Sequence, residues 1–140
     1  MTFTQKETML LKDLKSQEEL CIEKYGKYAA DACDGELKNL FTSIRSTEQQ
    51  HLAVINGYLG ETSPQQTAPV PEASCACNAQ NDKFLCLDAL TMEKQVSSVY
   101  DVCIFEFSDA SVRQKLNQLQ TEEQKHGEQI YQYMSKHGMY

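Results

Sequence analysis

Apolar residues recur at helical spacing in four stretches of this 140-residue chain. The first stretch covers about residues 4–33, where the apolar positions follow one another at steps of three, four and seven. Its stripe consists of Leu11, Leu14, Cys21, Tyr25, Tyr28 and Ala32. The other stretches cover about residues 36–59, 83–107 and 110–136. Because this spacing places apolar side chains on one helix face, the pattern predicts four amphipathic helices.

Ionisable residues interrupt the apolar stripes at positions that should face a core. The second stripe is Leu37, Phe41, Ile44, Glu48, His51, Ile55 and Leu59. The fourth stripe is Val112, Leu116, Leu119, Glu123, His126, Ile130 and Tyr133. In the first stripe Glu18 lies between Leu14 and Cys21, and Glu93 lies within the third stripe in the same way. The pattern therefore predicts six ionisable side chains inside the protein.

The connections between the predicted helices differ in length. Residues 60–82 have no helical period and are rich in Pro, Ser, Thr, Gln and Ala, so they are predicted to form a linker. Gly35 is expected to end the first helix in a left-handed cap, Asp109 to cap the fourth helix, and Gly138 to end it. A linker of this length suits a crossover in a bundle. We therefore expect residues 1–140 to form one all-α domain, a four-helix bundle of two hairpins.

The two halves of the chain align without a gap at an offset of 75 residues. The matched pairs include Glu18 with Glu93, Tyr25 with Tyr100, Glu48 with Glu123, His51 with His126, and Ile55 with Ile130. An internal repeat of this kind predicts two similar structural units. The expected arrangement is two hairpins related by an approximate two-fold axis.

Each half carries a Glu-x-x-His motif with another glutamate thirty residues before it. Positions i and i+3 share a helix face, and a four-helix bundle brings such a set to one interior point. Four buried carboxylates cannot stay ionised without partners, and two divalent cations would balance their charge. Oxygen and imidazole ligands suit iron, manganese or zinc. The predicted metal ligands are Glu18, Glu48, His51, Glu93, Glu123 and His126.

Net charge and hydropathy exclude several classes of protein. The formal charge is −7 and no basic stripe is present, so nucleic acid is not an expected partner. No apolar run approaches the roughly 20 residues of a membrane helix. The first residues lack a basic segment followed by an apolar one, so no secretory signal is inferred and cytoplasmic synthesis is expected.

Cysteines and tyrosines add further candidates. Four of the six cysteines lie in helical patterns and are expected to be reduced, semi-buried thiols. Cys75 and Cys77 lie in the linker, where they could bind a soft metal or form a redox pair with Cys86. Tyr25 and Tyr100 are expected in the core, where their hydroxyls need partners, and the metal ligands are candidates for these partners. Expected on solvated surfaces are Glu19, Glu23, Glu106, Glu122, Glu128 and His137.

The six predicted ligands resemble those of the ferritin-like superfamily, in particular the di-iron bundles of rubrerythrins and bacterioferritins. There the first and third helices each give a glutamate, and the second and fourth each give Glu-x-x-His. The resemblance implies a di-iron site. The chain departs from rubrerythrins at Val96, where they carry a further carboxylate, and it lacks their two Cys-x-x-Cys pairs. The pattern predicts four helices and not the fifth that is usual in cage-forming ferritins, so iron storage in a cage is not expected.

The last residues carry a second resemblance. Residues 134–140, Met-Ser-Lys-His-Gly-Met-Tyr, resemble the ending Met-x-x-x-Gly-x-Tyr of the spore coat F family, whose members are also ferritin-like bundles. This implies a structural or assembly role in a spore coat, around an intact two-metal site. The alternatives are a small di-iron oxidase or peroxidase acting on dioxygen or peroxide, and a metal-buffering module using Cys75 and Cys77. A homodimer and contacts with other coat proteins are expected.

Overall fold

Four long helices pack side by side in the computed structural model, which describes residues 2–63 and 78–140. They are α1 (Gln5–Asp31), α2 (Gly35–Leu59), α3 (Ala79–Glu106) and α4 (Ala110–Lys136). The described residues contain no strand. The prediction of an all-α chain with four helices is therefore confirmed.

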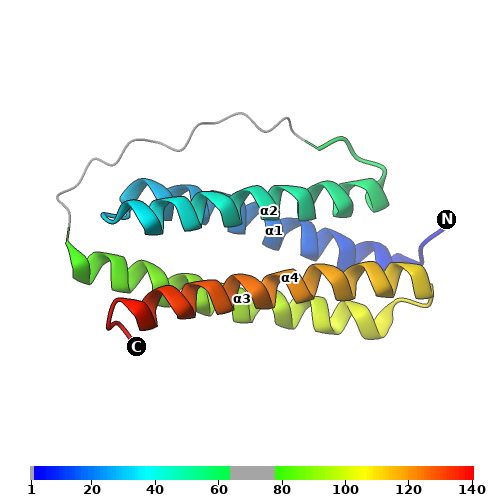
Figure 1. The fold of residues 1–140 in the computed structure, drawn as a ribbon. Coiled ribbons are helices and arrows are strands. Elements are labelled where there is room, and N and C mark those ends of the chain that lie inside the picture. Colours follow the sequence, from blue (N-terminus) through cyan, green and yellow to red (C-terminus); the bar gives the residue numbers. More distant parts are fainter. Residues whose placement is uncertain (1, 64–77) are drawn as a thin grey trace.

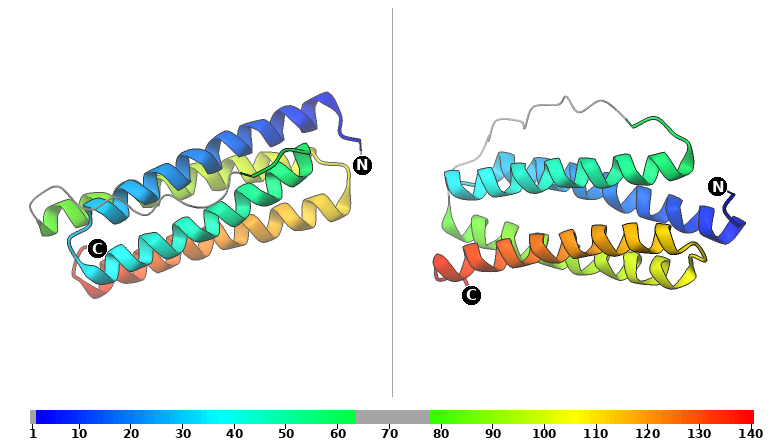
Figure 2. Two further views of the ribbon diagram at one scale, coloured as in Figure 1. Left: turned by 90° about the horizontal axis from the view of Figure 1, so that it is seen from above. Right: turned by 45° about the vertical axis from the view of Figure 1, so that its right-hand side comes forward.

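The helices form two hairpins that pack on each other. Helix α1 runs antiparallel to α2, and α3 runs antiparallel to α4, with the two chain ends at opposite ends of the molecule (Figure 1). Across the hairpins α1 packs on α3 and α2 packs on α4, and these pairs are also antiparallel (Figure 2). The core contains the apolar stripe of every helix, with Leu14, Phe41, Tyr100 and Leu116 completely buried. Each such side chain contributes about 1.5–3 kcal/mol through burial.

Side-chain caps fix where α1 and α4 begin. The Thr4 hydroxyl accepts the Glu7 N–H at 3.1 Å, and the Glu7 carboxylate accepts the Thr4 N–H at 2.9 Å, which is a capping box. The same carboxylate accepts the Ser108 N–H at 3.2 Å and so joins α1 to the turn between α3 and α4. Asp109 caps α4 by accepting the Val112 N–H at 3.0 Å, as predicted.

The predicted left-handed cap at Gly35 is wrong. Helix α1 ends at Asp31, and Gly35 is the first residue of α2. Among the described residues a positive φ occurs at Gly60 (71°) and at Gly138 (67°). Both follow a helix end, where the left-handed conformation favours glycine. The prediction that Gly138 ends the fourth helix is therefore confirmed, whereas the turn between α1 and α2 is stabilised in another way.

A buried carboxylate at the start of α3 stabilises the turn between α1 and α2. Helix α3 begins at Ala79, four residues before its predicted start at Lys83. In this extra turn Asp82 is buried and accepts the N–H groups of Cys33 at 2.7 Å and Asp34 at 3.1 Å. The amides between α1 and α2 thus obtain their partner from α3. Because the buried residue of this turn is polar, the apolar pattern does not reveal it.

Residues 64–77, with Cys75 and Cys77, lie outside the described part of the chain. Of the helical cysteines, Cys21, Cys86 and Cys103 are buried thiols. Burial raises the pKa of Cys86 and of Cys103 to about 12, which keeps both protonated. No helix among the described residues has the length and hydropathy that crossing a membrane requires.

Candidate metal centre

The six predicted ligand side chains meet in the middle of the bundle. Helices α1 and α3 each contribute one glutamate, and α2 and α4 each contribute a glutamate and a histidine one turn apart. All six are buried, with no more than 4% of any residue exposed. They are Glu18, Glu48, His51, Glu93, Glu123 and His126. Inward-facing positions on four different helices thus bring together residues up to 108 apart (126 − 18) in the sequence.

The six residues form two overlapping groups of four. In each group one carboxylate oxygen or ring nitrogen per residue lies within 4.8 Å of the others. The first group is Glu18, Glu48, His51 and Glu123. The second group is Glu48, Glu93, Glu123 and His126. Because Glu48 and Glu123 belong to both groups, the two groups lie next to each other and share two carboxylates.

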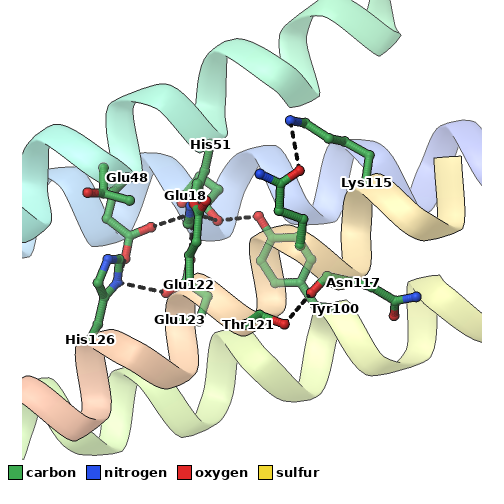
Figure 3. A network of polar contacts seen from close by, with 12 residues as sticks. Glu18, Glu48, His51, Tyr100, Lys115, Asn117, Thr121, Glu122, Glu123 and His126 are labelled. Carbon is green, nitrogen blue, oxygen red and sulfur yellow. Dashed lines mark hydrogen bonds and ion pairs between the residues drawn. The ribbon is translucent and has the colours of Figure 1, made fainter. Parts of the chain in front are cut away.

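Each shared carboxylate turns one oxygen toward each histidine (Figure 3). The Nδ1 atom of His51 lies 2.8 Å from Glu123 Oε1 and 3.2 Å from Glu48 Oε2. The Nδ1 atom of His126 lies 3.2 Å from Glu48 Oε1 and 3.4 Å from Glu123 Oε2. The two rings are nearly parallel, at 22°, and their centroids are 6.0 Å apart. Both histidines therefore point the same nitrogen at the centre, one on each side of it.

Several buried polar atoms of this cluster have no hydrogen-bond partner. These atoms are Oε2 of Glu18, both oxygens of Glu48, Oε2 of Glu93, Oε2 of Glu123 and Nδ1 of His126. A buried polar atom left without a partner costs about 1–3 kcal/mol, and more when it is charged. Oxygen and imidazole nitrogen atoms directed at common points are the ligands that divalent transition metals take. The donor set therefore fits two metal ions.

Three glutamates of the cluster, Glu18, Glu48 and Glu93, hold protons more firmly than ordinary carboxyl groups. Burial, together with the charge of Glu18, raises the pKa of Glu48 to about 7. Burial and the neighbouring Glu123 carboxyl raise the pKa of Glu93 to about 8. Burial also raises the pKa of Glu18. Without cations, protons thus neutralise part of the negative charge at the centre.

The two histidines are also protonated when no metal is present. Burial opposes the charge on His126, but the carboxylates of Glu123, Glu48 and Glu93, all within 3.5 Å of Nδ1, outweigh it and raise its pKa to about 11. The same balance raises the pKa of His51 above its ordinary value. A metal ion at Nδ1 has to displace this proton, so metal binding and proton release are coupled here.

Two buried tyrosines connect the hairpins at this centre. The Tyr25 hydroxyl on α1 donates to Oε1 of Glu93 on α3, and the Tyr100 hydroxyl on α3 donates to Oε1 of Glu18 on α1. Both tyrosines are completely buried. The expectation that their hydroxyls need partners is confirmed, and the partners are two of the predicted ligands, Glu93 and Glu18. Each hydroxyl fixes one oxygen of its glutamate and leaves Oε2 without a hydrogen bond.

Glu122 is a site residue that the sequence pattern misses. It was predicted on a solvated surface, yet its Oε2 lies 2.6 Å from His51 Nε2, and its side chain is only 31% exposed. A carboxylate at the outer nitrogen orients the ring so that Nδ1 faces the centre. The offset of 75 places Thr47 at the corresponding position of the first half, so the two histidines have different surroundings. The contact depends on how α4 packs on α2, which no local pattern encodes.

The C-terminal part of the chain is similar to a known protein family. Residues 81–140 match the Coat F domain. This Coat F region includes most of α3 and all of α4, which supply Glu93, Glu123 and His126. The match supports the resemblance inferred from residues 134–140. Comparisons with curated proteins and with solved structures gave no match.

Proposed function

We propose that this protein is a spore coat component with a structural or assembly role, and that its bundle binds two metal ions. The Coat F region supports the coat role. The pair of hairpins, with ligands from all four helices, supports a ferritin-like bundle. Iron is the proposed metal, and manganese or zinc would accept the same ligands.

The sharing of Glu48 and Glu123 between two ligand groups is the observation that carries the metal proposal. Each ion would take one histidine and one unshared glutamate, and the two shared carboxylates would join the ions. Four carboxylates would then balance two divalent charges. Since each ligand group includes residues from both hairpins, the bound ions would also hold the hairpins together. This gives the metal pair a structural use without any turnover.

The double variant Glu48→Ala with Glu123→Ala tests this proposal. Elemental analysis should find two ions per wild-type chain and none in the variant, because both shared ligands are lost. A matched control, Glu19→Ala with Glu128→Ala, removes two exposed carboxylates and should keep both ions. An unchanged metal content in the first variant would refute the site.

The same variant should be more stable than the metal-free wild type. The two remaining glutamates, Glu18 and Glu93, balance the two histidine cations, whereas the wild type also buries Glu48 and Glu123. Replacing buried charge by apolar groups is commonly neutral or stabilising. Thermal unfolding in the presence of a chelator measures this difference.

The coat role has a separate test. A fusion of the protein to a fluorescent marker, made in the spore-forming host, should fractionate with the coat of purified spores. Recovery only from the soluble fraction of growing cells would contradict that role. This result does not depend on metal content.

Redox chemistry is a second candidate function, favoured by an opening that leads from the surface to Glu93 and Glu123. Bound iron would supply electron exchange with dioxygen or peroxide, and the chain would position it and limit access. Iron-loaded protein would then consume peroxide over many cycles. Stoichiometric metal without turnover favours the structural role. Metal buffering requires Cys75 and Cys77 and predicts a lower metal count when both become serine.

A further inference from the structure

A groove of about 620 Å³ lies between α3 and α4 and reaches two of the ligand glutamates, Glu93 and Glu123. Gly127, one turn beyond Glu123, and Ser97, one turn beyond Glu93, line it. Both are small residues. The groove therefore passes where two helix faces carry little side-chain volume, beside two residues of the second ligand group.

The other hairpin has larger residues at the corresponding positions. The offset of 75 relates Gly127 to Leu52 and Ser97 to Ile22. Leu52 is buried, with 5% of its surface exposed, so it fills space in the first hairpin. One pair of glutamates shows a difference in the same direction, because Glu93 is 4% exposed and its counterpart Glu18 is 0% exposed, whereas Glu123 and Glu48 are both 0% exposed. The two metal positions are thus similar in ligands and different in access.

We propose that this groove admits small uncharged molecules, of the size of dioxygen or hydrogen peroxide, to the metal held by Glu93 and His126. The inference rests on the proposed metal pair. It adds the direction from which small molecules would reach that pair. At the rim Lys94 and Glu128 carry opposite charges, and the walls are mainly apolar or hydroxyl-bearing. The charges of Lys94 and Glu128 offset each other, so the groove favours neither anions nor cations. A neutral molecule is therefore the class of ligand that fits.

A second hollow does not provide the same route. It has a volume of about 240 Å³, lies between α2 and α4, and is lined by His126 and Glu122. The His126 atom that faces the ligand cluster is Nδ1. A molecule in this hollow meets the outside of the imidazole ring and none of the ligand carboxylates. Of these two openings, the groove between α3 and α4 is the one that contacts predicted carboxylate ligands of the centre.

Gly127 allows a direct test because a side chain fits there. A Cβ atom at this position would meet only Leu90 Cδ2, at 4.0 Å, which is ordinary contact. Glycine within a helix is also less favourable than alanine by about 1 kcal/mol. Gly127→Leu should therefore fold and fill the groove as Leu52 fills its counterpart. Gly57→Leu is the matched control, since Gly57 is an exposed residue of α2 with no neighbour within 4 Å.

The experiment loads wild type and both variants with ferrous iron without oxygen, measures metal content, and then follows nitric oxide binding by stopped-flow absorbance. We expect two ions in each protein. Nitric oxide should bind at least about tenfold more slowly to Gly127→Leu, and at the wild-type rate to Gly57→Leu. Equal rates for wild type and Gly127→Leu, with both proteins loaded, would overturn the route.

The outcomes separate this inference from the proposed function. A wild type that binds no iron refutes the metal pair and the route with it, whereas loaded proteins with equal rates refute only the route. If Gly127→Leu lowers the metal content, Ser97→Ile replaces it in the experiment. This variant introduces the residue found at the corresponding position, Ile22, and it lies on α3, away from the Glu-x-x-His motif of α4. A wild-type rate in loaded Ser97→Ile would then refute the groove as the entrance.

Discussion

Each unshared glutamate of the centre is held by a tyrosine from the opposite hairpin. Tyr25 reaches Glu93 and Tyr100 reaches Glu18, and both pairs are buried. A hydroxyl bound to one oxygen restricts the rotation of the carboxylate and selects which oxygen remains for an ion. Partners of this kind raise metal affinity by holding ligands in place. In the proposed metal centre the two tyrosines would therefore act as positioning residues.

Tyr25→Phe should weaken metal binding about ten- to hundredfold, because Glu93 loses its hydroxyl partner while the ring still fills the core. Tyr28→Phe is the control, since the Tyr28 hydroxyl donates to Asp88, which is not one of the six ligands. Competition with a chelator measures both affinities. Equal affinities for the two variants would contradict a positioning role, since both lose one hydroxyl from α1.

At the scale of the helices, buried polar groups fix the junctions that apolar packing leaves open. Asp82 on α3 accepts two amides between α1 and α2, and Glu7 on α1 accepts one between α3 and α4. Both carboxylates are buried. The turn of each hairpin thus donates hydrogen bonds to a carboxylate of the other hairpin. These bonds fix the position of one hairpin along the axis of the other.

Asp82→Ala should lower the free energy of unfolding by about 2–3 kcal/mol, because two amides lose a charged acceptor. Asp101→Ala, an exposed position on the same helix, should change it by less than about 0.5 kcal/mol. Denaturant unfolding of metal-free protein gives both values. Similar values for the two variants would show that the junction contributes nothing.

The helices and the ligand set follow from local sequence because helical periodicity is a local property. Glu48 and His51 could be assigned to the core since they replace apolar residues at core spacing, and the repeat gave the same assignment to Glu123 and His126. The start of α3 was predicted too late, because the buried residue of its first turn is Asp82. A polar core residue looks like a surface residue in the sequence.

Contacts between the hairpins could not be predicted in this way. The partner of His51 at its outer nitrogen is Glu122, and the choice depends on the rotation of α4 against α2. The crossing of Tyr25 to Glu93 depends likewise on how α1 lies along α3. The sequence places these residues on faces, and only the packed bundle decides which faces meet.

For the molecule as a whole, the centre makes metal-free stability depend on pH. In the folded state the pKa of Glu48 is about 7 and that of Glu93 about 8, both above the ordinary value of 4.5. Between pH 5 and 8 the folded protein therefore binds more protons than the unfolded chain, and its stability falls as pH rises. The raised pKa of His126 acts in the same direction above pH 6.5.

We expect the melting temperature of the metal-free protein to fall by roughly 10 °C from pH 5 to pH 8. With metal bound, cations replace the protons, so the fall should be smaller or reversed. Calorimetry with and without chelator measures this. The variant Glu48→Gln with Glu93→Gln should flatten the metal-free profile. A metal-free melting temperature that rises over this range would contradict buried, proton-holding glutamates.

The joining of two similar hairpins in one chain has a consequence for how such a protein can change. Two identical hairpins assembled as separate subunits would have to alter both sides of the centre at once. In this chain a mutation at Gly127 does not change Leu52. The space beside Glu123 can therefore change in size while the corresponding space in the first hairpin stays filled. A chain that carries both hairpins therefore allows each half to change by itself, whereas a dimer of identical hairpins would change on both sides at once.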